Sequence, residues 1–323
     1  MSTSQDLGYL SAARYGKQLV KIARVVREGD QHFIVEYVIR ALLEGDIETS
    51  YTEADNTVVV ATDSVKNTCN VFAKTSPHVL NPPVFALHLG LHFVTKYAHI
   101  TKAFIDIEQL KWSRIEVNGK PHKWSFIRDG DEKSLVECVV DASGGKESVK
   151  ADLKVGMKDL LVLKTSGSAF ENFYRDEFTT LAGKSFQPII QYVSDRIFST
   201  SVSIQSTITL PPNTPLTIDN LSDIAKELDF PKLTSQIRKD VLETFAEDES
   251  ASVQATMYIT MQNILKSCPA VKETSMQLPN KHYIPINLSA FKLDNGLGYE
   301  GGAKVFHPTA DPSGYITATV TRK

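Results

Sequence analysis

His282 lies near the start of a segment that is predicted to be a β-strand. Residues 279–283 read Pro-Asn-Lys-His-Tyr, and the alternation that follows places His282 on the same face as Ile284 and Ile286. A histidine with an ordinary pKa of about 6.5 can accept or donate a proton at neutral pH. A lone histidine on an apolar face is also a common structural residue. A role in proton transfer therefore requires that other segments supply the rest of the chemistry.

Two other segments place polar groups at the start of a predicted helix. Residues 61–64 read Ala-Thr-Asp-Ser and could either cap the helix or present backbone N–H groups to an anion or a carbonyl oxygen. Ser252 precedes a second helical stripe, and Gln254 lies in its first turn. The Gln254 amide offers a donor and an acceptor in one plane, which suits the edge of a heteroaromatic ring. A solvent-facing glutamine would fit the same position.

Three more side chains extend this set. Arg196 lies in a predicted strand, where its guanidinium could bind a planar anion through two hydrogen bonds or pair with Asp195. Phe170 follows a stretch of small residues and could stack on a flat ligand, although core packing is the usual role of a phenylalanine. Lys17 precedes the first strand and could act as a base if it were buried beside a polar partner, whereas an exposed lysine would be solvated.

The elements that must position these residues occur in a similar order twice. The first half has strand-like stretches at 18–29 and 32–44, helical patterns from 62 and from 82, a hairpin turn at 118–119, and a strand at 134–141. The second half has strands at 152–165 and 187–207, helices at 219–228, 234–246 and from 253, and strands at 280–289 and 313–322. This order predicts an α+β protein with two tandem domains, residues 1–148 and 149–323, each built on an antiparallel sheet. A sheet of long, half-buried strands has two faces that must be shielded from water. This predicts helices on one face and a second copy of the chain on the other.

Composition excludes several classes of function. The net charge of −3 and the 23% of charged residues give no global attraction for nucleic acid or for an anionic membrane. Cys69, Cys138 and Cys268 are far apart and odd in number, which predicts a reducing compartment. No apolar run approaches the length of about 18 residues that a membrane helix needs.

Neither a metal nor a dinucleotide is predicted. Among the histidines between residues 78 and 99, only His88 and His92 share an i, i+4 face, and no third ligand accompanies them. Residues 296–301 match the pattern G-x-G-x-x-G, but the strand before it and the helix after it that the pattern requires are missing from the sequence.

Taken together, the segments resemble one family closely: the urate oxidases, or uricases, of the tandem tunnelling fold (T-fold). The resemblance covers nearly the whole chain, and the last two of its motifs are highly specific in combination. The matching stretches are Ala-Arg-Tyr-Gly-Lys at 13–17, Leu-Glu-Gly-Asp-Ile-Glu-Thr-Ser-Tyr-Thr at 43–52, Val-Ala-Thr-Asp-Ser-Val-Lys-Asn-Thr at 60–68, Phe-Ile-Arg-Asp at 126–129, Arg-Asp-Glu-Phe-Thr-Thr at 175–180, Ser-Val-Gln-Ala-Thr-Met-Tyr at 252–258 and Leu-Pro-Asn-Lys-His-Tyr at 278–283.

The resemblance implies a site for the urate anion. In such a site, Arg196 and Gln254 hold two edges of urate, and Phe170 stacks on its face. The backbone amides of Val253 and Asp63 complete the contacts in the plane of the ring. Each of these positions carries the expected residue type in this sequence.

The resemblance also implies the catalytic residues and the assembly. Lys17, Thr62 and His282 would form a proton relay, while Asn280 and Thr62 would hold dioxygen, and later water, above the ring. Thr62 and Asp63 would come from a neighbouring subunit, so the site would be complete only in a homotetramer whose sheets close into a β-barrel tunnel.

The implied reaction needs no cofactor. Urate is electron-rich and can reduce dioxygen once it is doubly deprotonated, so the protein has only to orient it, remove a proton and hold oxygen. The expected activity is the oxidation of urate by O2 and water to 5-hydroxyisourate and H2O2, the first step of urate degradation to allantoin. A peroxisomal location is expected from the resemblance, although the sequence ends in Thr-Arg-Lys rather than in a peroxisomal address, and the cytoplasm is the alternative.

Two alternatives belong to other classes of function. The chain could be a catalytically inactive oligomer that binds purines, which the presence of Lys17, Thr62 and His282 disfavours. It could also be another T-fold enzyme that acts on a pterin or a purine, which normally requires a metal-ligand cluster or a glutamate anchor. Arg196 together with Gln254 argues against this second alternative.

Overall fold

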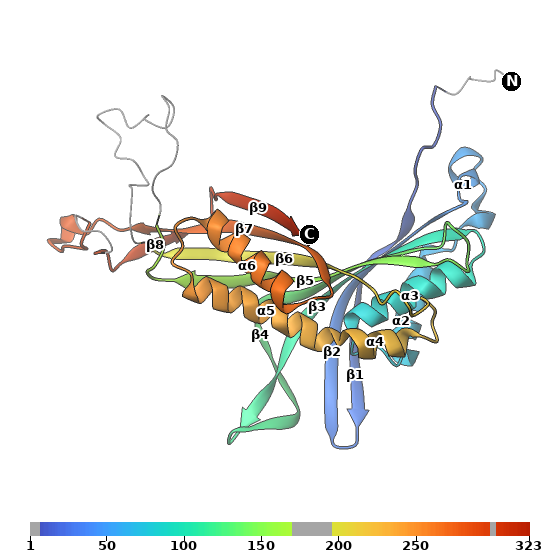
Figure 1. Ribbon diagram of the computed structural model, residues 1–323, viewed down its shortest axis with the longest axis horizontal. Coiled ribbons are helices and arrows are strands. Elements are labelled where there is room, and N and C mark those ends of the chain that lie inside the picture. Colours follow the sequence, from blue (N-terminus) through green and yellow to red (C-terminus); the bar gives the residue numbers. More distant parts are fainter. Residues whose placement is uncertain (1–6, 170–195, 298–301) are drawn as a thin grey trace. The chain divides into compact units, whose positions relative to one another are not determined.

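The computed structural model describes residues 7–169, 196–297 and 302–323, and the chain divides into two compact units (Figure 1). The first unit contains residues 1–157, 205–234 and 270–272, and the second contains residues 158–204, 235–269 and 273–323. Each unit is therefore assembled from segments that are distant in the sequence. The domain boundary after residue 148 stays a prediction.

Four antiparallel strands form the sheet of the first unit in the order β1-β2-β3-β4: β1 (Tyr15–Glu28), β2 (Gln31–Gly45), β3 (Ile100–Val117) and β4 (Lys120–Asp141). The turn between β1 and β2 contains Gly29 at a φ of 59°, a left-handed conformation that glycine adopts without steric cost. Asn118 and Gly119 join β3 to β4 with φ angles of 52° and 72°, as expected for a two-residue hairpin turn. The predicted hairpin turn at 118–119 is confirmed.

Helices cover one face of this sheet. The helical segments of the first unit are α1 (Thr49–Thr52), the 3-10 turn η1 (Asn56–Val58), α2 (Thr62–Thr75), α3 (Pro82–Lys96) and α4 (Leu221–Leu228). Along β2, every second side chain from Val35 to Leu43 is buried, because this row packs towards the helices. α3 contacts β3 and β4, and α2 contacts β1, as Figure 1 shows. No helix in the described ranges is long and apolar enough to cross a membrane.

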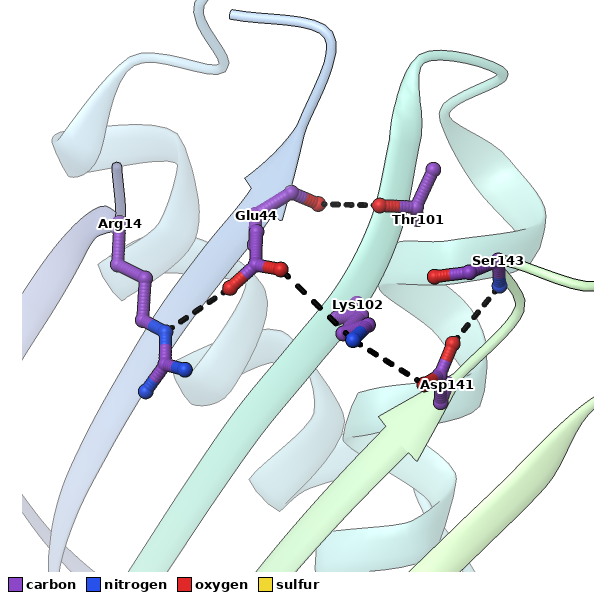
Figure 2. A network of polar contacts seen from close by, with 6 residues as sticks. All are labelled: Arg14, Glu44, Thr101, Lys102, Asp141 and Ser143. Carbon is purple, nitrogen blue, oxygen red and sulfur yellow. Dashed lines mark hydrogen bonds and ion pairs between the residues drawn. The ribbon is translucent and has the colours of Figure 1, made fainter. Parts of the chain in front are cut away.

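A row of alternating charges crosses the strands of the first unit at one end of the sheet (Figure 2). Glu44 lies 2.9 Å from the Arg14 guanidinium and 3.9 Å from the Lys102 ammonium, and Lys102 lies 3.3 Å from Asp141. Glu44 is the register partner of Lys102, which is in turn the register partner of Asp141. Opposite charges that face each other directly stabilise a strand pairing by a few tenths of a kcal/mol to about 1 kcal/mol.

β1 contains a bulge next to Lys17. Lys17 pairs with Ala41 and Val20 pairs with Ile39, so β1 has one more residue than β2 between these two pairs. Bulges of this kind bend a strand and change the direction in which a side chain points. Gly16 allows β1 to lie this close to β2, because a Cβ atom at this position would lie 2.0 Å from the Ala41 carbonyl oxygen.

We expect Gly16→Ala to lower the free energy of unfolding by about 1–3 kcal/mol, because the added methyl group meets backbone atoms that cannot move independently. Gly144→Ala is the matched control, since a Cβ atom there would meet nothing within 4 Å. Denaturant unfolding of both variants measures the difference. Equal stability of the two variants would show that β1 and β2 can separate locally at no cost.

The second unit combines the ends of several strands with two long helices. Its elements are β5 (Lys150–Lys164), which begins in the first unit, β6 (Phe198–Ile208), which ends there, β7 (Val271–Pro285), β8 (Phe306–Thr309), β9 (Tyr315–Thr321), most of α5 (Phe230–Glu247), α6 (Val253–Ser267) and the 3-10 turn η2 (Ser289–Phe291). The strand order is β5-β6-β7-β8, and β9 also pairs with β7. The Phe198 and Phe245 rings lie 5.2 Å apart and join β6 to α5.

The predicted strand at 280–289 is wrong at both ends. β7 starts at Val271 and ends at Pro285, and residues 289–291 form η2. The buried row on β7 is Thr274, Met276 and Leu278, and Ile284 is exposed. Pro285 has no N–H group to continue a ladder, and the chain leaves the strand at this residue.

Candidate active site

The start of α2 carries Thr62 and Asp63, two of the predicted site residues, in the first unit. α2 begins at Thr62, and its N-cap is Ala61, whose side chain cannot accept a hydrogen bond. The polar capping that the sequence predicted at residues 62–64 is therefore wrong, since these residues lie inside the first turn. N–H groups in the first turn of a helix have no partner within that helix and favour an anion or an oxygen atom.

Lys17 reaches this helix start from β1. Its ammonium lies 3.3 Å from Asp63 Oδ1, and Lys66 lies 3.1 Å from the same oxygen. Lys66 and Lys17 both hold the pKa of the Asp63 carboxyl below its usual range. The pair is open to solvent, with 71% of the Asp63 side chain exposed, so its contribution to stability is small. What the pair provides is proximity: it places the Lys17 ammonium beside Asp63, the residue that follows Thr62.

Tyr15 joins the same corner, although the sequence analysis gave it no role. The Val60 N–H donates to the Tyr15 hydroxyl at 2.8 Å, and burial raises the pKa of that hydroxyl. This bond ties β1 to the residues that precede α2. No local signal could have shown this contact, because the two residues are 45 positions apart.

The start of α6 belongs to the second unit and agrees with the prediction. Ser252 is the N-cap, and its hydroxyl accepts a hydrogen bond from the Ala255 N–H at 3.1 Å. Val253, the first helical residue, is 6% exposed, whereas the Gln254 side chain faces solvent. The side chain of Val253 is therefore buried in the core, whereas the Gln254 amide is exposed and can reach a ligand.

Arg196 lies close to this helix start through a short backbone ladder. The Arg196 N–H donates to the Ser168 carbonyl oxygen at 2.9 Å, and Ser168 pairs with Ser250 in a parallel bridge. The Arg196 side chain is half-buried, and burial lowers the pKa of its guanidinium. Phe170, the predicted stacking residue, lies outside the described residues.

β7 carries Asn280 and His282 on one face, in line with Met276 and Leu278. The Asn280 N–H donates to the Gly314 carbonyl oxygen at 2.8 Å. Its side-chain oxygen is buried and has no hydrogen-bond partner among the residues that the structure describes. A buried amide oxygen in this state costs about 1–3 kcal/mol, so it favours a small donor such as water.

A second contact steadies this part of β7. The Thr200 hydroxyl on β6 donates to the Pro279 carbonyl oxygen at 2.9 Å, next to Asn280. His282 is half-buried and is the register partner of Thr309 on β8. Thr200 was not predicted from the sequence, although its place in the alternation along the strand marks it as a buried hydroxyl that needs a partner.

The predicted site residues therefore fall into two groups. Lys17, Thr62 and Asp63 lie together in the first unit. The second group, in the second unit, consists of Arg196, Val253, Gln254, Asn280 and His282. Within each group the contacts join the elements that carry these residues.

The histidines of α3 have structural partners. His88 Nδ1 lies 2.9 Å from the Ser76 hydroxyl, and its ring meets Phe72 edge-on at 4.8 Å. In the part of the chain that the structure describes, no three His, Cys, Asp or Glu side chains are arranged to hold a metal ion. Burial lowers the pKa of His88 to about 4, and the neighbouring His78 and His92 act in the same direction.

This lowered pKa predicts a dependence of stability on pH. The unfolded chain binds the His88 proton more tightly than the folded chain, so the free energy of unfolding should fall as the pH is lowered from about 6.5 towards about 4. His88→Asn keeps a partner for Ser76 but cannot gain a proton, and should lose less stability over this range. Denaturant unfolding at several pH values measures both slopes. Identical slopes would contradict the assignment.

Comparisons with known proteins show which family the chain resembles. The sequence model of the family described as Uricase matches residues 13–139 and 153–317. The chain is 42% identical over 317 residues to a uricase of Schizosaccharomyces pombe, covering 98% of each chain, and 41% identical over 317 residues to a uricase of Aspergillus flavus, covering 97% of each. The solved structure of uricase from Arthrobacter globiformis is 30% identical, with a TM-score of 0.81 over 98% of this chain and 96% of that one.

These relatives match along the whole chain, and the antiparallel sheets with helices have the T-fold of the solved uricases. The matched segments span both groups of site residues. The chain therefore belongs to the uricase family.

Proposed function

We propose that the chain is a urate oxidase that converts urate, O2 and water to 5-hydroxyisourate and H2O2, the first step of urate degradation to allantoin. Urate loses two electrons and O2 gains them, and water supplies the hydroxyl group of the product. The observation that carries the proposal is the match to the uricase family over nearly the whole chain.

Arg196 and Gln254 hold the edges of urate in this proposal. The planar guanidinium donates two hydrogen bonds to one edge, and the exposed Gln254 amide at the start of α6 faces another. Phe170 stacks on the ring, and the Val253 and Asp63 amides complete the contacts in the plane. Orientation of the ring lowers the barrier, because the reacting atoms no longer have to find one another.

Lys17, Thr62 and His282 move the protons. The Thr62 hydroxyl can accept and donate at once, so it can pass a proton between Lys17 and His282. Asn280 and Thr62 hold O2, and later water, above the ring. The buried Asn280 oxygen without a partner in the described chain supports this role, because a water molecule could donate to it. Doubly deprotonated urate supplies the electrons, so we propose a reaction without a cofactor.

The site is proposed to be complete only in a homotetramer. Thr62 and Asp63 of one copy would meet Arg196 and Gln254 of another, in a tunnel lined by the tandem domains 1–148 and 149–323. We infer a peroxisomal location from the family resemblance alone. Constant activity per chain in a sample that is monomeric by sedimentation would contradict the shared site.

Loss of the ultraviolet absorbance of urate in air tests the activity directly. We expect one H2O2 for each urate consumed, and no consumption under argon. A folded tetramer that binds urate under argon but never consumes it in air would instead be an inactive purine-binding protein. A tetramer that binds no urate would point to a different T-fold substrate, such as a pterin.

Chelators are expected to leave this activity unchanged, because the proposed mechanism uses only side chains, urate and O2. The assay is repeated after dialysis against EDTA, with metal content measured before and after. Stoichiometric zinc or copper that leaves together with the activity would overturn the reaction without a cofactor.

A further inference from the structure

Lys164 is a partly buried lysine that the mechanism above does not use. It ends β5, and its ammonium donates to the Asp248 carbonyl oxygen at 2.5 Å and to the Ser250 hydroxyl at 3.0 Å. The Phe198 and Phe245 rings lie 5.9 and 5.5 Å from it. Burial lowers the pKa of Lys164, while Asp248 and Glu249 act in the opposite direction. An ammonium in this setting needs every hydrogen bond it can make.

A directed chain of hydrogen bonds leads from this ammonium to a carboxylate. Ser250 Oγ lies 2.6 Å from Thr256 Oγ1, and Thr256 Oγ1 lies 2.6 Å from Asp248 Oδ2. An ammonium can only donate and a carboxylate can only accept. The Ser250 hydroxyl therefore accepts from Lys164 and donates to Thr256, which donates to Asp248. Each hydroxyl in the chain uses both of its roles.

Ser250 is the point where this chain meets the backbone ladder of the site. The Ser250 N–H donates to the Gly167 carbonyl oxygen at 3.0 Å, and the Ser250 carbonyl oxygen accepts from the Ala169 N–H at 2.9 Å. The Arg196 N–H bonds to the Ser168 carbonyl oxygen, between these two contacts. The position of Ser250 therefore fixes the segment on which the Arg196 backbone rests.

Thr256 connects the same chain to the start of α6. It is 2% exposed and lies one turn after Val253, the first residue of that helix. The Thr256 hydroxyl bonds to Asp248, and Ser252 caps α6, so the segment from Asp248 to Ser252 is held to the helix at both ends. The first turn of α6, which contains Gln254, thus has a fixed position relative to Ser250.

We propose that Lys164 is a positioning residue for Arg196 and Gln254, the two residues that hold the edges of urate. Through Ser250, Thr256 and Asp248, it fixes Arg196 and the start of α6 at the spacing that urate requires. This inference rests on the proposed function. The four polar side chains do not touch urate. They act by setting the distance between Arg196 and Gln254, so their loss weakens binding rather than removing a reacting group.

Thr256→Val and Thr256→Ser test the chain at its centre. Valine has the shape of threonine without the hydroxyl, whereas serine keeps the hydroxyl. We expect Thr256→Val to raise the Kd for urate under argon about tenfold and to change kcat at saturating urate in air less than about threefold. Thr256→Ser should restore the Kd to within about threefold of the unaltered chain.

Thr260→Val is the matched control, because Thr260 lies one turn further along α6, is 1% exposed and donates to the Thr256 carbonyl oxygen at 2.8 Å. Its Kd should not change. An equal rise of Kd in Thr256→Val and Thr260→Val would mean a general loosening of α6 and would overturn the proposal. An unchanged Kd in Thr256→Val would overturn it as well.

Lys164→Met gives an independent test if Thr256→Val does not fold. It should raise the Kd in the same way, whereas Lys239→Met, at an exposed lysine of α5 that lies 3.7 Å from Glu243, should not. Failure of the unaltered chain to bind urate would refute the proposed function instead. Normal binding by the unaltered chain and by Lys164→Met together would refute only the positioning role.

Discussion

Replacing Lys17 by methionine is expected to lower kcat for urate by about a hundredfold or more, the usual contribution of a positioned acid or base. The ammonium lies beside the first turn of α2, 3.3 Å from Oδ1 of Asp63, the residue that follows Thr62. Methionine is unbranched like lysine and only one atom shorter, but it cannot carry a proton. Because the chain assembles this corner within one unit, the fold should survive the change.

Lys66→Met is the matched control for this variant. Lys66 contacts the same Asp63 oxygen at 3.1 Å, so its loss changes the charge around Asp63 to a similar degree. If Lys17 served only to neutralise Asp63, both variants would lose the same activity. We expect Lys66→Met to keep kcat within a few-fold of the unaltered chain.

Thr62→Ala should lose as much activity as Lys17→Met, and the double variant should be hardly worse than either. Both residues belong to one proton relay, so either substitution alone already stops proton transfer, and the second substitution has no further effect. His282 variants should share this behaviour with a milder single effect. Steady-state kinetics of the double-mutant cycle, with tetramer assembly checked for each variant, measures whether the two losses add. Fully additive losses would mean that Lys17 and Thr62 work independently.

Arg196→Lys is expected to raise KM about 10- to 150-fold, the equivalent of about 1.5–3 kcal/mol for hydrogen bonds to a charged group. A lysine ammonium is a point charge and cannot reproduce the planar two-pronged contact. The half-buried position of Arg196 strengthens the effect, because water cannot easily replace the missing donor. kcat should change much less than KM.

Arg322→Lys is a suitable control for the loss of a guanidinium in the same unit. Arg322 bonds to the carbonyl oxygens of Leu265 and Cys268 at the end of α6, far along the helix from Gln254. It should leave KM unchanged even if thermal stability falls. A KM that stays the same in Arg196→Lys would show that Arg196 does not hold urate.

Sequence patterns predicted the local elements of this protein well and its long-range contacts hardly at all. The hairpin at Asn118-Gly119 and the Ser252 cap follow from residues within a few positions of one another, so local rules suffice. The pairing of Lys17 with Asp63 joins residues 46 positions apart, and that of Lys164 with Ser250 joins residues 86 positions apart. Such contacts depend on strand order and bulges, which periodicity does not encode.

β7 shows why even local predictions can fail. The predicted strand began at residue 280, yet Pro279 lies inside β7 as the register partner of Tyr315. A proline is tolerated where its missing N–H is not needed by a neighbouring strand. The alternation beyond His282 then led the prediction past Pro285, where the chain has already left the strand. Whether a neighbouring strand needs the N–H group of a given residue depends on the tertiary structure, so the sequence pattern of one strand does not reveal it.

The charge row of Figure 2 has a consequence for how this sequence can diverge. Lys102 serves two acidic partners, Glu44 and Asp141, so reversing its charge creates two like-charged pairs at once. Reversal of all four charges of the row, Arg14 included, would restore every pairing. We therefore expect the signs of these positions to covary among relatives, and library designs that exchange the row as a block should outperform single substitutions.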